Sequence, residues 1–129
     1  MKIVSSYSQI TLYANNSEDA YDVEDFPEWT DDLEEKVAFS SSAIFIATKD
    51  DSIISVSIQN FEPAGMINLG SYFLKTNLNM IVLSSPDCIN APEEVMIPTI
   101  KERTKISIFC DSPEDATKIV LVSDDIAIN

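Results

Sequence analysis

Residues 43–58 read AIFIATKDDSIISVSI, and this stretch decides the fold class of the chain. Its first run, AIFIAT, is apolar on both faces, as in a central strand that is covered on both sides. Its second run, IISVSI, alternates apolar residues with serine, which is the period of a half-buried strand. The four polar residues KDDS join the two runs, and this length predicts a tight β-hairpin.

Short apolar or alternating segments recur along the chain, at residues 2–14, 66–75, 78–84, 105–110, 118–122 and 126–128. Turn residues separate these segments, and no alternation of strands with long helices is visible. In the segment 66–75, the spacing places Ile67, Leu69 and Phe73 on one face. The pattern predicts a mainly β chain: an antiparallel β-sandwich of seven or eight short strands, forming a single acidic domain over residues 1–129.

One short helix is expected near residues 30–38. Thr30 is a good helix N-cap, and the two aspartates that follow it favour a first helical turn through the helix dipole. Leu33 and Val37 then follow at helical spacing.

The charge balance excludes several classes of function. The chain carries 22 acidic and 8 basic residues, a formal net charge of −14, and no histidine. Such a surface repels nucleic acids and anionic membranes and attracts basic proteins or cations. Without histidine, the chain lacks the commonest general base and the usual metal ligand. We therefore expect no enzyme, no cofactor, no metal, no direct nucleic-acid binding and no membrane association.

The two cysteines and the amino terminus add two expectations. Cys88 and Cys110 have no CxxC spacing, and each is expected to be a small core side chain. The first residues lack the apolar run of a signal peptide, which predicts a cytoplasmic protein.

Several loops could instead hold calcium, because they cluster carboxylates that could converge at the ends of a sandwich. These candidates are Asp50–Asp51, Asp87, Asp111 with Glu114 and Asp115, and Asp124–Asp125. Their spacing matches no EF-hand, so acidic turns are the simpler interpretation. One basic cluster, formed by Lys101, Arg103 and Lys105, is expected to balance a neighbouring acidic strand rather than to bind phosphate.

The segment from Glu18 to Glu35 holds ten acidic residues and no basic residue, interrupted by aromatic and apolar side chains. It is either a solvated loop or a negatively charged docking surface that aromatic residues hold in place. A solvated loop has no need for a tryptophan, which is costly to leave exposed. The expected partner-binding residues are Glu24, Asp25, Glu28, Asp31, Asp32 and Glu35. The expected anchors are Phe26 and Trp29.

Five stretches, taken in order, make the chain resemble the competence protein J family. They are Tyr7 to Tyr13, Trp29 to Asp31, residues 43–58, residues 107–110 and the apolar ending 119–128. The resemblance implies a small protein that binds and silences a nuclease and has no catalytic activity, and it assigns no contact residues. A row of carboxylates could fill the groove in which a nuclease binds DNA phosphates.

The leading interpretation is therefore a non-catalytic inhibitor that binds a basic partner protein, a nuclease, through its acidic surface. The alternative is a calcium- or ligand-binding β-sandwich module. The sequence does not determine the oligomeric state.

Overall fold

The computed structural model describes residues 1–5, 8–14, 36–76, 79–84 and 94–127. Within these ranges the chain forms ten β-strands and no helix, which confirms a mainly β fold with more strands than the expected seven or eight. The strands are β1 (Lys2–Val4), β2 (Gln9–Ala14), β3 (Val37–Phe39), β4 (Ala43–Ala47), β5 (Ile53–Gln59), β6 (Ile67–Lys75), β7 (Met80–Ser84), β8 (Glu94–Pro98), β9 (Arg103–Cys110) and β10 (Lys118–Val122).

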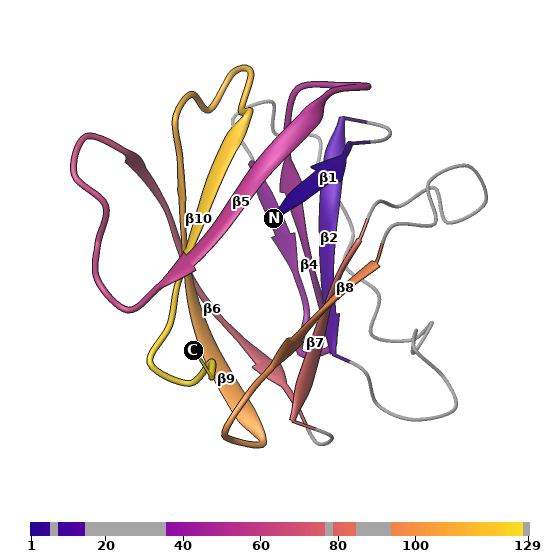
Figure 1. Cartoon of the computed structure of the whole chain (residues 1–129), viewed down its shortest axis with the longest axis vertical. Helices are drawn as coiled ribbons and strands as arrows, with labels where there is room; N and C mark the ends of the chain where they lie inside the picture. The colour runs from indigo at the N-terminus through magenta and orange to yellow at the C-terminus, as the bar shows by residue number, and fades with distance from the viewer. Residues whose placement is uncertain (6–7, 15–35, 77–78, 85–93, 128–129) are drawn as a thin grey trace.

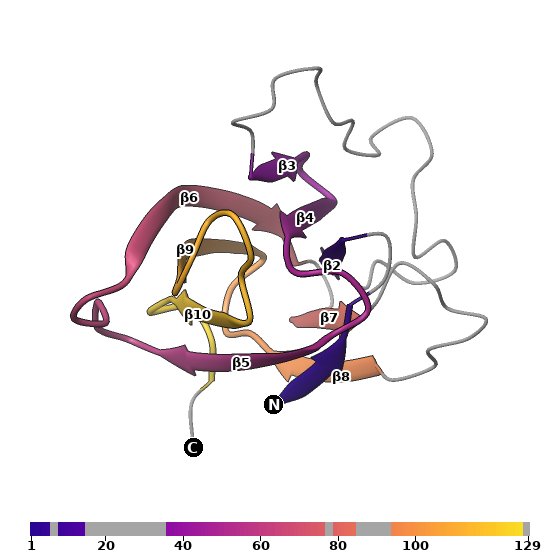
Figure 2. The same ribbon diagram turned by 90° about the horizontal axis from the view of Figure 1, so that it is seen from above.

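The strands form two five-stranded sheets that face each other in a sandwich-like arrangement (Figures 1 and 2). Sheet A has the order β1-β5-β10-β9-β6, and sheet B has the order β3-β4-β2-β7-β8. Sheet A is mixed, because β5 and β10 run parallel, with Ile119 opposite Val56 and Leu121 opposite Ile58. The expectation of a purely antiparallel fold is therefore wrong for this pair of strands. A parallel pair needs a crossover connection, and here the chain forms β6 to β9 between the two strands.

The expected hairpin of residues 43–58 does not form. Both runs are strands, but β4 lies in sheet B and β5 lies in sheet A, so the turn at residues 49–52 carries the chain between the sheets. The amino-terminal segment holds this turn: the Ser8 N–H donates to the Asp50 carboxylate over 2.8 Å, and the Ser52 N–H donates to Ser5 Oγ over 3.1 Å. Turn length was compatible with a hairpin, but the two runs pair with other strands.

The expected helix near residues 30–38 is wrong where the structure describes it. Residues 37–39 form the edge strand β3, with Val37 opposite Ile46 and Phe39 opposite Ile44 of β4. Residues 30–35 lie outside the described ranges. Val37 and Ala38 are both buried, so burial and backbone pairing with β4 outweigh the local helical spacing.

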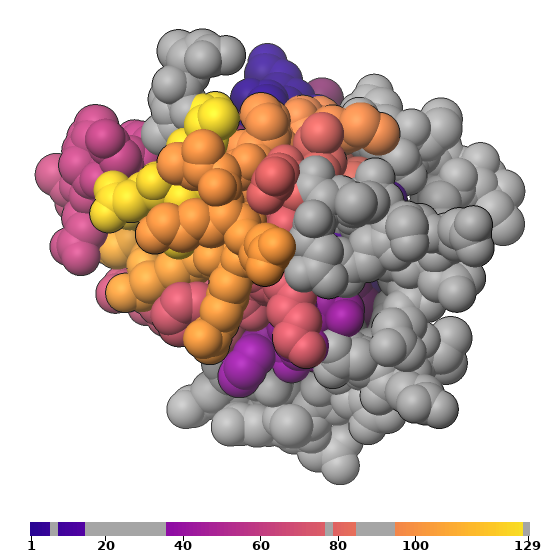
Figure 3. Space-filling view, turned by 90° about the horizontal axis from the view of Figure 1, so that it is seen from below, coloured from indigo at the N-terminus to yellow at the C-terminus, as the bar shows by residue number. Residues whose placement is uncertain are grey.

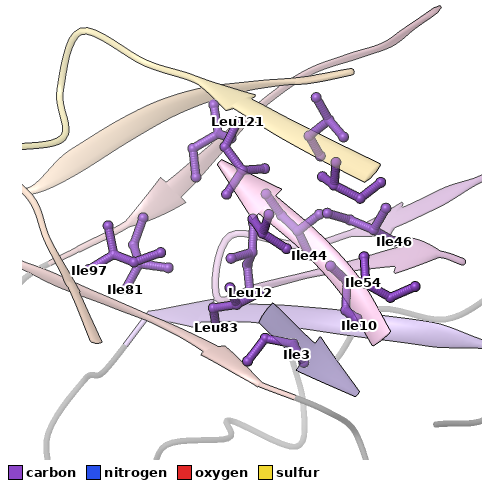
Figure 4. Packing of buried hydrophobic residues seen from close by; sticks show 14 of the residues in the cluster. Ile3, Ile10, Leu12, Ile44, Ile46, Ile54, Ile81, Leu83, Ile97 and Leu121 are labelled. Carbon is purple, nitrogen blue, oxygen red and sulfur yellow. The ribbon is translucent and has the colours of Figure 1, made fainter. Parts of the chain in front are cut away.

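The apolar core lies between the sheets and draws side chains from both (Figure 4). Ile3 and Ile54 point inward from sheet A, and Leu12, Ile44 and Leu83 point inward from sheet B; all five have no exposed surface. Full burial of one such side chain contributes about 1.5–3 kcal/mol. The alternation in IISVSI and the two-sided burial of AIFIAT are both confirmed, since β5 is buried at alternate residues and β4 on both faces.

A β-bulge in β6 overturns the expected grouping of Ile67, Leu69 and Phe73. The register with β9 shifts between Asn68 and Gly70, so Leu69 packs against the core whereas Phe73 is 44% exposed. Gly70 has φ +115°, a backbone conformation that residues with side chains rarely adopt. An extra residue in a bulge changes which face the later side chains take, and alternation alone does not reveal it.

Candidate functional site

The residues predicted to contact a partner lie outside the described part of the chain. All eight fall within residues 15–35: Glu24, Asp25, Phe26, Glu28, Trp29, Asp31, Asp32 and Glu35. Their roles as contacts and anchors therefore stay predictions. What the structure describes is the frame to which this segment is joined.

Sheet B holds both ends of the segment. Strands β2 and β3 flank β4 and are each antiparallel to it, so they run in the same direction. The chain leaves sheet B after Ala14, whose N–H donates to the Ser42 carbonyl over 2.9 Å. It returns at Lys36, whose carbonyl accepts the Ala47 N–H over 2.9 Å, beside the start of β2. The two attachment points thus lie at opposite ends of the sheet.

The outer face of sheet B carries a second apolar cluster, formed by Tyr13, Ala38, Ala43, Phe45 and Val82. Each of these residues is at most 5% exposed, although their side chains alternate with those of the core. Beside them, the buried Thr11 hydroxyl donates to the Ser84 carbonyl over 3.1 Å. The inner strands of sheet B, β4, β2 and β7, are therefore buried on both faces, whereas antiparallel sheets commonly leave one face to solvent.

The charge of the chain is distributed unevenly. All 8 basic residues lie in the described ranges, together with 10 of the 22 acidic residues. The other 12 acidic residues, with no basic residue among them, lie outside these ranges. The described sheets are thus close to neutral, and nearly all of the negative excess belongs to the remaining segments.

Three of the carboxylates proposed as calcium ligands, Asp50, Asp111 and Asp125, accept hydrogen bonds from backbone N–H groups. Asp111 accepts the N–H groups of Ser112, Thr117 and Lys118 over 3.0–3.1 Å and the Thr117 hydroxyl over 2.9 Å. Burial acts to raise the pKa of Asp111, but these hydrogen bonds together hold it below its ordinary value. No three acidic or cysteine side chains gather into a possible metal site among the described residues; Asp87 lies beyond them.

The basic cluster lies on and beside β9. Lys101 Nζ is 3.0 Å from Asp125, and the Asp125 carboxylate also accepts the Lys105 N–H over 3.0 Å. The hydrogen bond from Lys105, and then that from Lys101, lowers the pKa of Asp125. The expected acidic strand is not the partner of this cluster: Lys101 pairs with Asp125, which lies in the bend after β10. Sequence reasoning missed the aromatic partner: the Arg103 guanidinium lies 4.1 Å from the centre of the Phe73 ring.

Cys110 is a free, fully buried thiol on the core side of β9, as expected for a small core side chain. Burial, reinforced by the charge of Asp111, raises its pKa and keeps the thiol protonated. Cys88 lies outside the described residues. No helix in the described ranges has the length and apolar character needed to cross a membrane.

The fold described above has a counterpart among solved structures. No protein-family model and no curated protein matches the sequence. Among solved structures, the chain is similar to the crystal structure of ComJ from Bacillus subtilis, described as an inhibitor of the DNA-degrading activity of NucA. The TM-score is 0.70 and the sequence identity 15%, over 95% of this chain and 92% of ComJ. At this identity the comparison establishes a shared fold, in agreement with the resemblance noted in the sequence.

Proposed function

We propose that the chain is a non-catalytic inhibitor that binds and silences a basic partner protein, a nuclease, through an acidic surface. The observation that carries this proposal is the fold shared with ComJ over 95% of the chain. The lack of histidine and the net charge of −14 support it, because inhibition by surface contact needs no catalytic group.

The proposed contact residues are Glu24, Asp25, Glu28, Asp31, Asp32 and Glu35. A nuclease presents Lys and Arg side chains to the DNA phosphates, and a row of carboxylates can occupy the same groove. The ten acidic residues from Glu18 to Glu35 support this role, because no Lys or Arg lies among them. The long-range field would also accelerate association with a basic partner.

Phe26 and Trp29 are proposed to anchor this segment on sheet B. The buried cluster on the outer face of that sheet supports the proposal, since Tyr13 directly precedes the point where the chain leaves β2. Ala38 of the same cluster lies just after the chain returns at β3. Apolar side chains of residues 15–35 packed there would leave the neighbouring carboxylates facing a partner.

The same proposal includes a cytoplasmic location, a single domain, and no cofactor or direct binding to nucleic acid. A mobility-shift titration with duplex DNA tests the last point, and a shift at physiological salt would contradict it.

A pull-down followed by a nuclease assay tests the proposed function. The immobilised protein is used to capture basic proteins from the cells that produce it, and each captured protein is assayed for DNA degradation. We expect a nuclease whose activity falls to background when the inhibitor is added at equimolar amount. The control is the Glu24→Lys/Glu28→Lys variant, which should inhibit poorly at the same concentration. A captured nuclease that stays fully active with excess protein would overturn the proposal.

A further inference from the structure

One end of the outer face of sheet A carries half of the basic residues of the chain. In the register between β6 and β9, Lys75 lies opposite Arg103, and Phe73 lies opposite Lys105. Lys101 precedes β9 in the adjoining turn. Like charges that lie directly opposite each other destabilise a pair of strands. In a chain of net charge −14, these four cations lie close together, although their mutual repulsion does not stabilise the sheet.

Of these cations, Lys101 alone forms an ion pair with a carboxylate of the described residues. Within that part of the chain, the Lys101–Asp125 contact is the one ion pair closer than 4.0 Å. The Arg103 guanidinium is placed instead over the ring of Phe73. The side chains of Lys75, Arg103 and Lys105 are all exposed. The four cations outnumber the neighbouring carboxylates of Glu102, Asp124 and Asp125 by one, in contrast to the charge of the whole molecule.

A hollow of about 400 Å³ opens beside these side chains. Lys101 and Lys105 contribute positive charge to its lining, and Asp124 and Asp125 contribute an equal negative charge. Ser107 contributes a hydroxyl group, and Phe73 and Val122 contribute apolar surface. The segment that contains Lys101 and the C-terminal segment, which both line the hollow, lie side by side at the end of the molecule shown in Figure 3. The volume falls within the range of about 300–1,000 Å³ that is typical of pockets for small molecules.

The fixed position of Phe73 gives the hollow a defined apolar wall. The bulge at Gly70 turns the Phe73 side chain to the outer face, and the Arg103 guanidinium, 4.1 Å from the ring centre, covers part of the ring. Ser107 is held by a hydrogen bond of 2.6 Å between its hydroxyl and that of Ser71. Lys101 is held by its ion pair with Asp125, which leaves the Lys105 ammonium as the least restrained cation.

We propose that this hollow binds a small organic anion in which one phosphate or carboxylate group is attached to an aromatic or apolar group. The Lys105 ammonium and the Ser107 hydroxyl would hold the anionic group, and Phe73 and Val122 would contact the apolar part. A ligand with a single anionic group fits better than a nucleic acid, because every further negative charge is repelled by a molecule of net charge −14. This site is independent of the proposed inhibitor function.

Calorimetric titration with phenyl phosphate, benzoate and inorganic phosphate tests the site. At low ionic strength we expect saturable binding of phenyl phosphate or benzoate with a Kd below about 1 mM. Inorganic phosphate should bind at least about tenfold more weakly, because it cannot use the apolar wall. The ranking of phenyl phosphate and benzoate identifies the preferred anionic group. Absence of saturation with both organic probes would overturn the proposal.

Two variants and a matched control locate the binding. Lys105→Gln should weaken binding about tenfold, while Lys105→Arg should retain it. Lys118→Gln removes an exposed cation from the opposite end of β10 and should leave binding unchanged. If Lys105→Gln and Lys118→Gln lose the same affinity, the loss reflects the net charge of the protein and not a contact in the hollow. That result would overturn the assignment. Unchanged melting temperatures would show that the variants remain folded.

Discussion

The rings of Phe39 and Tyr72 lie with their centres 4.7 Å apart and their planes tilted by 49°. Phe39 belongs to β3, an edge strand of sheet B, and Tyr72 belongs to β6, an edge strand of sheet A. Close by, the Lys75 N–H donates to the Ser41 carbonyl over 2.8 Å. The two sheets are thus joined along one side by a ring contact and a backbone hydrogen bond, which protects two edges that could otherwise pair with other chains.

The contact between Phe39 and Tyr72 should contribute a measurable coupling free energy. A double-mutant cycle with Phe39→Leu and Tyr72→Leu should give about 0.5–1.5 kcal/mol in the free energy of unfolding. Urea denaturation of the four proteins provides the measurement. Phe61→Leu is the control, since Phe61 is 64% exposed and should change stability little. Additive effects of the two substitutions would show that the ring contact contributes no stability.

Replacing Gly70 should destabilise the protein by roughly 1–3 kcal/mol, because the alanine would be strained at φ +115°. A Cβ atom at this position would also lie 2.8 Å from the Tyr72 hydroxyl oxygen, which donates to the Leu69 carbonyl. Urea denaturation of Gly70→Ala provides the measurement. Gly65→Ala is the matched control: Gly65 has φ +75° but no atom within 4 Å of the added Cβ. If Gly65→Ala costs as much as Gly70→Ala, the contact with Tyr72 adds nothing to the backbone strain.

The Asp111 carboxylate should make stability depend on pH in the acidic range. Its pKa is lowered in the folded state, so its contribution is fully present above the ordinary value of 3.8 and is lost as the pH falls through the folded-state pKa. Asp111→Ala should lower the melting temperature at pH 7, and the difference from wild type should shrink below about pH 4. Thermal unfolding from pH 3 to pH 7 tests this. A difference that stays constant over this range would assign the effect to packing instead of charge.

Charge reversal in the acidic segment should weaken binding to the partner and preserve the fold. Glu24→Lys/Glu28→Lys places two positive charges against a basic partner, and we expect the Kd to rise while the melting temperature stays unchanged. Trp29→Ala should lower both affinity and stability, by roughly 3–5 kcal/mol in stability if the ring is buried. Glu62→Lys, in the turn after β5, is the control for overall charge. Unchanged affinity of the double variant at low salt would place the contact face elsewhere.

Association with the nuclease should slow steeply as salt is added. Screening shortens the range of the electrostatic field from about 30 Å at 0.01 M salt to about 8 Å at 0.15 M. The on-rate should fall over this interval, whereas the off-rate, which depends on desolvated contacts, should change much less. Surface-binding kinetics with the captured nuclease measure both rates. An on-rate that is independent of salt would contradict electrostatic inhibition even if binding itself occurs.

Local patterns in the sequence predicted which side chains enter the core but not which strands pair. Alternation in IISVSI identified Ile54 and Val56 as core residues, and both are completely buried. The same pattern could not show that β5 pairs with β10, about sixty residues later, instead of with the adjacent β4. Periodicity describes the two faces of one strand, whereas pairing depends on the sum of contacts with every other strand.

For the candidate sites, too, some properties were determined by the sequence and others by the tertiary structure. The sequence alone determined the net charge of −14, the absence of histidine and the acidic run from Glu18 to Glu35, because these properties need no folding to exist. Tertiary structure decided that residues 37–39 pair as a strand and that the bulge at Gly70 turns Phe73 toward Arg103. These outcomes depend on contacts between residues that are distant in the chain. The energies of these contacts outweigh the local helix and strand propensities of a few residues, which are worth only tenths of a kcal/mol each.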